Sequence, residues 1–404
     1  MSNTPGRAVL PEDYRTAIDR EVESLLPELV EIRRHLHKHP EVSWRERETM
    51  QFLSGKLESH GIEHRTGLAK TGIALDIEGV GPGPLTAYRA DMDAIALAEG
   101  KNVEYASVNP GVMHACGHDF HMAVALGAAV IASRLRGQLQ GRLRVFFQPA
   151  EEVVPAGSAA MIEDGVMEGV DSVFALHVEP ALPQGQVGLP YGAVTASADQ
   201  FDLLIRGRSG HSSRPFKAID AILIATKVVE AIYQVVGQRA DPLEGAVVNV
   251  GTIEGGDAAN VICGHVRASG ALRCFNPELR TELQEWMDEL VGGIARGMGG
   301  DCELVFHRGA PPLFNSTALV DRVRDAALEV VGEQGLTLIE RPSMGGEDFS
   351  WYGELSEVAM FRIGTGTPDN DAQLHNELFD AGDEALAPAL RVVARTLFAS
   401  NNEG

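Results

Sequence analysis

Three histidines and a cysteine occur within nine residues, in the segment Met113-His-Ala-Cys-Gly-His-Asp-Phe-His121. Cys116 and His118 are two residues apart, so in an extended loop their side chains point the same way. Thiolate and imidazole are good ligands for zinc and similar divalent ions. Taken alone, this cluster is explained equally well by a buried thiol beside surface histidines.

Two adjacent carboxylates, Glu151 and Glu152, follow the apolar segment 142–147. That segment is predicted to be a buried strand, and open α/β sheets place their sites just past the carboxyl ends of such strands. One carboxylate there can bind a metal while its neighbour acts as a general base on an activated water. A lone Glu-Glu pair would instead indicate only the N-terminus of the next helix.

Two further histidines fall at comparable places. His177 ends the apolar run 173–178, and His375 follows the predicted strand 358–364 and a polar loop. A single strand histidine is usually a satisfied core or surface residue. Four candidate ligand groups at the carboxyl ends of separate strands in one sheet favour a metal centre.

The elements needed to position these residues are readable from hydrophobic periodicity. Leu25, Leu29, Ile32 and Leu36 have helical spacing,. Helices and strands alternate around them, which predicts an α/β domain: a mostly parallel sheet with helices on both faces. The predicted helices cover residues 11–39, 46–60, 120–136 and 319–333, and the predicted strands 72–78, 84–91, 142–147, 172–178 and 358–364.

Residues 201–307 show another order, β-α-β-β-α-β, which is the ferredoxin-like split unit. We therefore expect residues 1–195 and 309–404 to form a metal-binding catalytic domain. Residues 196–308 would be an inserted lid and dimerisation domain, with hinges near 191–200 and 308–315.

Composition limits the classes of partner. The chain has 404 residues and a net charge of −23, which disfavours nucleic acid and anionic membranes as partners. The polar N-terminal segment 1–14 lacks the apolar core of a secretory signal, and the run 124–132 is too short to span a bilayer. Four cysteines in a chain of this length do not indicate a disulfide scaffold, so we expect reduced thiols and a cytoplasmic protein,.

Together these motifs resemble the aminoacylase and glutamate-carboxypeptidase family of two-metal peptidases, specifically its amidohydrolase branch. That branch includes hippurate hydrolases, N-acyl amino acid amidohydrolases and auxin-conjugate hydrolases. The similar strings span nearly the whole chain in order: residues 33–41 (RRHLHKHPE), 89–94 (RADMDA), 113–119, 147–152 (FQPAEE), 175–178 (ALHV), 259–262 (ANVI), 344–349 (MGGEDF) and 374–375.

The resemblance implies a site with two divalent metal ions per chain, Zn²⁺ or Mn²⁺. It implies that Glu151 is the general base. It also implies five metal ligands: Cys116, His118, Glu152, His177 and His375. Cys116 would bridge the ions, one adding His118 and His177 and the other Glu152 and His375. Asp91, Asp93 and Asp119 would orient ligand imidazoles, although ordinary loop or capping roles fit these three nearly as well.

The resemblance also implies a small-molecule amide substrate and a homodimer formed through the lid. His211 would reach the neighbouring subunit's site and stabilise an oxyanion. Asn260 and Arg273 would bind a substrate carboxylate, while a surface strand position explains Arg273 equally well. Phe216, Cys263 and Ala271 depart from the pattern expected of the lid, which leaves substrate choice open.

Three alternatives remain at this point. One is a dipeptidase or aminoacylase-type peptidase of the same family. Another uses Cys116 as a nucleophile with His118 or His114 as base, but it gives the paired glutamates no role. The third is a non-catalytic metal-binding scaffold protein, which would need no spare carboxylate such as Glu151.

Overall fold

The computed structural model describes residues 10–241, 243–370 and 372–402. The first nine residues, on which the expectation of no secretory signal partly depends, lie outside the described residues. The chain forms two packing units, each with its own apolar core. The large unit comprises residues 10–194, 314–341 and 351–402, and the small unit 195–313 and 342–350.

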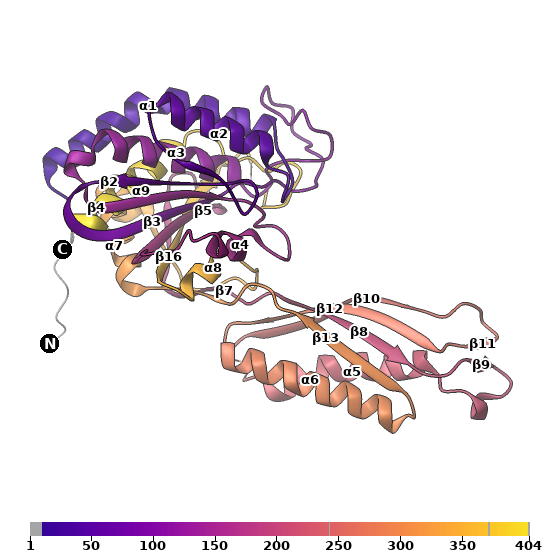
Figure 1. The fold of residues 1–404 in the computed structure, drawn as a ribbon. Helices are drawn as coiled ribbons and strands as arrows, with labels where there is room; N and C mark the ends of the chain where they lie inside the picture. Colours follow the sequence, from indigo (N-terminus) through magenta and orange to yellow (C-terminus); the bar gives the residue numbers. More distant parts are fainter. Residues whose placement is uncertain (1–9, 242, 371, 403–404) are drawn as a thin grey trace, which may run out of the picture. The chain divides into compact units, whose positions relative to one another are not determined.

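The large unit is built on an eight-stranded sheet (Figure 1). In spatial order its strands are β1 (Arg65–Leu68), β2 (Gly72–Glu78), β4 (Gln140–Gln148), β3 (Val80–Asp91), β5 (Ser172–Pro183), β16 (Glu357–Gly366), β6 (Val187–Pro190) and β15 (Leu336–Ile339). The four central strands β4, β3, β5 and β16 are parallel, whereas β1–β2, β2–β4 and β16–β6 pair antiparallel. The α/β class is therefore confirmed, with a parallel centre and mixed edges.

Helices cover this sheet. The helices of this part of the chain are α1 (Glu12–Lys38), α2 (Arg47–Ser59), α3 (His118–Arg134), α4 (Gly157–Glu163), α7 (Thr317–Val331), α8 (Ser350–Gly353) and α9 (Leu386–Asn402). Those labelled α1, α2 and α3 lie above the sheet in Figure 1, and α3 packs against both of the others. α3 contacts α1, α9 and the central strands, and its residues 118–132 are all buried. A helix that is apolar on every side can only lie inside the core, as its sequence predicts.

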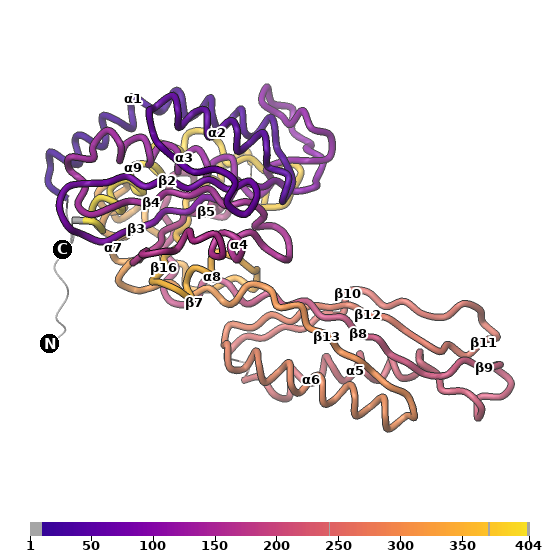
Figure 2. Tube along the Cα trace, in the orientation of Figure 1, coloured from indigo at the N-terminus to yellow at the C-terminus, as the bar shows by residue number. Residues whose placement is uncertain are grey.

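The small unit is a four-stranded antiparallel sheet covered by two helices, shown as a trace in Figure 2. Its elements are β8 (Asp199–Arg206), α5 (Ala221–Arg239), β10 (Ala246–Gly255), β12 (His265–Cys274), α6 (Pro277–Gly297) and β13 (Asp301–His307). The spatial order β10-β12-β8-β13 and the βαββαβ sequence are those of a ferredoxin-like unit,. Two short ribbons complete the fold: β9 (Gly210–His211) with β11 (Val261–Ile262), and β7 (Gly192–Thr195) with β14 (Leu313–Asn315).

Helix α5 is the one described helix whose length and composition would allow it to cross a membrane. Its buried side chains Ile224, Val228 and Ile232 instead belong to the apolar core of the small unit. A core helix of a soluble domain passes the same test, so α5 does not indicate a membrane span.

The course of β5 and the boundary of the small unit differ from what the sequence predicts. β5 continues to Pro183 instead of ending at residue 178, because the parallel strand β16 supports it along this length. Residues 342–350 group with the small unit although they lie beyond the expected boundary at 308. The Ala196 amide donates to the carbonyls of Ser343 and Gly345, and the Arg273 side chain donates to the Met344 carbonyl, which explains this grouping.

Candidate metal centre

Helix α3 and the loop before it bring the cysteine–histidine motif to the edge of the sheet. Gly117 precedes α3 with φ +82°, a left-handed conformation that L-residues with a side chain rarely adopt,. A Cβ at this position would lie 2.5 Å from Val178 Cγ2, so the backbone approaches β5 closely here. This turn places Cys116 and His118 on either side of a residue that packs on the strand carrying His177.

His177 lies inside β5, at the point where β5 has lost its neighbour β3. β3 pairs with β5 only along Ser172–Ala175, so the following residues of β5 face the loop before α3. The Cys116 Sγ is 3.5 Å from the His177 Nε2. The His177 Nδ1 lies 2.7 Å from the Val178 carbonyl and donates to it, which leaves Nε2 to bind a metal,.

The glutamates and His375 arrive from the loops after β4 and β16. Glu152 Oε1 is 3.3 Å from His375 Nε2 and 3.9 Å from His118 Nε2. His375 has φ +61°, and its amide donates to the Ala115 carbonyl at 2.9 Å. This backbone bond ties the loop of His375 to the loop of Cys116.

Two groups of three potential ligand atoms result, each with its atoms within 4.8 Å of one another. One consists of Cys116, His118 and His177, and the other of Cys116, Glu152 and His375. The family resemblance implies the same division of the expected ligands, with the cysteine in both sets. Glu151 lies with His118 and Glu152 in a third such group.

The donor atoms fit divalent metal ions. His118 Nε2 and Glu152 Oε1 are buried and have no hydrogen bond of acceptable geometry among the described residues. Buried polar atoms normally have a partner, and a metal ion would supply one to both. Sulfur, imidazole nitrogen and carboxylate oxygen together form a donor set that zinc and manganese accept.

The site also concentrates negative charge. Burial, then the charges of Glu152 and Glu151, raise the pKa of the Cys116 thiol well above its usual value. Burial opposes protonation of His118, but Asp91 and Asp93 outweigh it and raise its pKa to about 10. The carboxylates that favour a proton on His118 would equally favour a metal cation there. Burial and the nearby Arg362 lower the pKa of His177, which keeps its imidazole in the neutral form that binds metal,.

The three aspartates take different positions around this centre. Asp91 Oδ1 is 2.7 Å from His121 Nδ1, and His121 Nε2 accepts from the Val178 amide, so Asp91 supports β5 through His121. The backbone carbonyl of Asp93 accepts from His118 Nδ1 at 2.8 Å. Asp119, expected to orient a ligand imidazole, instead contacts His37 and Arg33 of α1 from the first turn of α3.

The lid residues are not brought together within one chain. The exposed His211 lies on β9 beside the β11 ribbon, and its Nδ1 accepts from the Ser213 amide at 3.1 Å. Asn260 lies next to it, where its carbonyl accepts from Ser212. Arg273 lies near the carboxyl end of β12, a strand that spans on the order of 30 Å at about 3.4 Å per residue,. Its Nη1 donates to the Met344 carbonyl.

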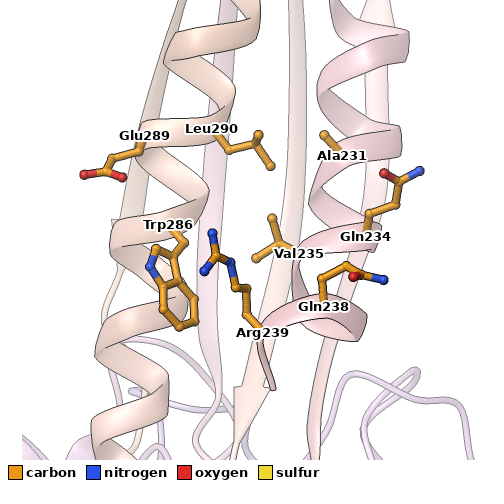
Figure 3. A pocket seen from close by; sticks show the side chains of 8 residues that line it. All are labelled: Ala231, Gln234, Val235, Gln238, Arg239, Trp286, Glu289 and Leu290. Carbon is orange, nitrogen blue, oxygen red and sulfur yellow. The ribbon is translucent and has the colours of Figure 1, made fainter. Parts of the chain in front are cut away.

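The positions that depart from the expected lid pattern are also in this unit. Phe216 is largely exposed near His211, whereas Cys263 is buried and its thiol donates to the His265 carbonyl. A hollow of about 440 Å³ between α5 and α6 is shown in Figure 3. It is lined by Trp286, Arg239 and other residues of these helices, and contains none of the expected site residues.

Several contributors to the centre were not expected from the sequence. His121 could have been found, because it follows His118 by three residues on the same helical face. His37 and Glu46 had no local signal, since their partners lie far away in the chain. His114 of the motif is buried with neither ring nitrogen hydrogen-bonded among the described residues, and burial lowers its pKa to about 3.

Comparison with known proteins identifies relatives along most of the chain. The profile of Peptidase family M20/M25/M40 matches residues 87–399. The N-acetyl-L-cysteine deacetylase of Bacillus subtilis is 38% identical over 384 residues, covering 94% of this chain and 90% of that protein. The N-acyl-L-amino acid amidohydrolase of Geobacillus stearothermophilus is 41% identical over 298 residues, which cover 74% of this chain and 80% of that protein. The crystal structure of the Bacillus subtilis YXEP protein is described as that of a dinuclear metal binding peptidase from the M20 family. It superposes on this chain with a TM-score of 0.80 at 32% identity, and the match covers 93% of this chain and 98% of that protein.

Proposed function

The chain belongs to Peptidase family M20/M25/M40 and is a metal-dependent hydrolase of amide bonds, and from this premise we propose that it cleaves N-acyl amino acids or similar small amide conjugates. The observation that carries the proposal is the sharing of Cys116 between two ligand groups, with Glu151 beside them. The names of the two amidohydrolase relatives support the substrate class.

Five residues would hold two metal ions, Zn²⁺ or Mn²⁺: Cys116, His118, Glu152, His177 and His375. When bound, two such ions polarise the amide carbonyl and make water a stronger nucleophile. The residues themselves exclude bulk water and hold the ligand atoms, because Cys116, His118 and His177 are all buried.

Glu151 is the proposed general base and acid. Its carboxylate would take the proton of the attacking water and deliver it to the nitrogen of the departing amine. Its backbone amide donates to Asp93 Oδ1 at 3.0 Å, which fixes the residue next to Glu152. A purely structural metal site would require no such second carboxylate.

The alternative with Cys116 as a nucleophile has less support. The thiol is 7% exposed and lies among carboxylates that raise its pKa, which disfavours the thiolate needed for attack,. The cysteine is better suited to binding metal, since a coordinating thiol is deprotonated by the ion.

We further propose a homodimer formed through the small unit. Within one chain, His211 lies on β9, paired with Val261 ahead of the start of β12, whereas Arg273 is the next-to-last residue of β12. This separation is too large for both side chains to contact one small substrate. An arrangement in which His211 serves the site of a partner subunit, as stabiliser of the oxyanion, accounts for this separation. Asn260 would then act beside His211, and Arg273 would bind a carboxylate.

The proposed location is the cytoplasm. All four cysteines are free and buried, as expected in a reducing compartment,.

The test is hydrolysis of N-acetyl, N-benzoyl and longer N-acyl amino acids, and of dipeptides, by the protein loaded with Zn²⁺ or Mn²⁺. Glu151→Gln should lower kcat by at least about 10²-fold while the metal content stays near two ions per chain. Glu163→Gln, which changes an exposed glutamate on α4, serves as the matched control. Equal turnover by Glu151→Gln and the control would refute the mechanism, and preference for dipeptides would favour a dipeptidase.

A further inference from the structure

Three successive backbone amides at the catalytic loop are held by two buried carboxylates. The Ala150 amide donates to Glu46 Oε1 at 2.9 Å. The amides of Glu151 and Glu152 donate to Asp93, at 3.0 Å to Oδ1 and 3.1 Å to Oδ2. Hydrogen bonds from three consecutive amides therefore fix the backbone of the loop that carries the proposed base and the proposed ligand.

Ala150 is the residue of this loop that most needs such support. Its φ is +54°, a left-handed conformation that is strained for a residue with a Cβ,. Its carbonyl accepts from the Gly157 amide at 2.8 Å, so both of its peptide groups are tied. Without the acceptor on its amide, Ala150 would relax toward ordinary backbone angles and rotate the two glutamates that follow it.

Glu46 makes this hydrogen bond from outside the set of proposed metal ligands, and the charge of Asp93 also acts on it. It is fully buried at the start of α2, and the described residues provide no ion-pair partner for it. Its Oε1 also accepts from the Trp44 amide at 2.9 Å, and its Oε2 accepts from the Thr71 hydroxyl at 2.8 Å. A buried carboxylate without a cation is costly, and here it serves only as a hydrogen-bond acceptor.

The segment around Glu46 supports Asp93 as well. The Ser43 hydroxyl donates to Asp93 Oδ2 at 2.7 Å, and the Ala94 amide donates to the Glu41 carbonyl. Residues 41–46 thus contact the end of β3 and the loop after β4 together. None of them is a proposed metal ligand or a proposed base, so their place beside the site calls for another explanation.

We propose that Glu46 is a positioning residue that sets the orientation of Glu151 and Glu152 through the backbone of Ala150. The inference rests on the proposed function for its catalytic readout, but it concerns a part of the chain that contacts neither substrate nor metal. Its action is geometric, so the reach of its Oε1 matters more than its charge.

Three variants of Glu46 separate the effect of its side-chain length from the effect of its charge. Glu46→Gln keeps an acceptor at the same position, so kcat should stay within about threefold of the wild type. Glu46→Asp keeps the charge but is one methylene shorter, and kcat should fall about tenfold. Glu46→Leu removes the acceptor, and a loss of about 10–100-fold is expected, as for residues that orient metal ligands. KM should change less than threefold in all three, because Glu46 does not touch the substrate.

Glu41→Ala is the matched control. Glu41 accepts from the Thr49 amide and hydroxyl at the same end of α2. Unlike Glu46, it holds no amide of residues 150–152, because those three amides donate to Glu46 and Asp93. This variant should lose stability as Glu46→Leu does, while kcat and zinc binding stay unchanged.

Two readouts are independent of catalysis. In the zinc-loaded protein, hydrogen exchange of the peptide covering residues 148–153 should accelerate at least tenfold in Glu46→Asp and Glu46→Leu, but not in Glu46→Gln or Glu41→Ala. Zinc affinity, measured by competition with a chelator, should fall in the same two variants.

Equal exchange rates in all four variants, or a kcat for Glu46→Asp at or above that of Glu46→Gln, would overturn the proposal. The Asp–Gln comparison decides the matter even if Glu46→Leu does not fold. If the wild type hydrolyses no amide, the proposed function fails, while exchange and zinc affinity still test Glu46.

Discussion

Arg33 and Arg34 offer a direct test of how α1 is attached to α3, the helix that begins with the proposed metal ligand His118. Arg33 is fully buried, and its guanidinium contacts Asp119 at 2.8 Å, Asp383 at 3.2 Å and Asp380. Arg34 contacts the same Asp383 at 2.6 Å, but its side chain is 45% exposed. Two adjacent arginines of one helix thus form ion pairs, one with a buried guanidinium and the other with an exposed one.

The expected effects differ severalfold. Arg33→Met leaves the carboxylate of Asp119 buried, and stranding one partner of a buried pair costs about 3–5 kcal/mol. At about 2 °C per kcal/mol for a domain of this size, Tm should fall by roughly 6–10 °C. Arg34→Met removes an exposed pair worth less than about 1 kcal/mol, so Tm should change by less than about 2 °C.

Differential scanning calorimetry of the zinc-loaded protein measures both effects. Adding Asp119→Asn to Arg33→Met removes the stranded charge and should restore part of the lost stability. If Arg33→Met and Arg34→Met differ by less than about 1 kcal/mol, the buried ion pairs do not anchor α1 as the structure indicates.

Three further predictions concern the metal, the backbone and pH. Chelation should lower Tm and abolish hydrolysis, and Zn²⁺ or Mn²⁺ should restore both. The reason is that free metal at about 100-fold its Kd stabilises the folded protein by about 2.7 kcal/mol. An unchanged Tm would contradict a metal site. Gly117→Ala should lose stability and zinc affinity because its Cβ would meet Val178, whereas Gly111→Ala, also at positive φ but in open space, should keep zinc affinity in the same chelator competition. Burial opposes ionisation of Glu99, but hydrogen bonds from His37 and the Ser107 amide lower its pKa to about 2. Because this folded pKa lies below the unfolded value near 4.5, Glu99 stabilises the protein above pH 4.5 and the contribution is lost as pH falls toward 2,. Glu99→Gln should flatten this acid dependence in urea unfolding at pH 3 and pH 6, and identical pH dependence in both proteins would argue against it.

The long elements of the fold follow from local periodicity. α1 and α3 lie within two residues of their predicted bounds, because α1 has apolar residues at helical spacing over many turns and α3 is one long apolar run. The short strands β1, β6 and β15 have no such pattern, since each has only four residues and forms through pairing with other strands. α9 is absent from the predicted elements even though its sequence is amphipathic, and it packs on α3 and α7.

The ligand types were readable from the sequence, but their support was not. Cys116 precedes a predicted helix, Glu152 and His375 follow predicted strands, and His177 lies at the end of one, and each of these is a local signal. The positive φ of Ala150 and His375 depends on contacts with Glu46 and Ala115, more than 100 residues away in the chain. Asp119 could not be assigned correctly because its partner, His37, lies on another helix.

The insertion of the small unit between the two halves of the large sheet affects how the protein is made. His118 and His375 are both proposed metal ligands, yet the ribosome adds the second about 260 residues after the first, which takes roughly 13–50 s at 5–20 residues per second. Residues 195–313 form a nearly contiguous unit and can fold on the nascent chain during this interval. β16, which lies beside β5 and precedes His375, emerges only afterwards. Assembly of the complete set of proposed ligands is therefore a late event of biosynthesis.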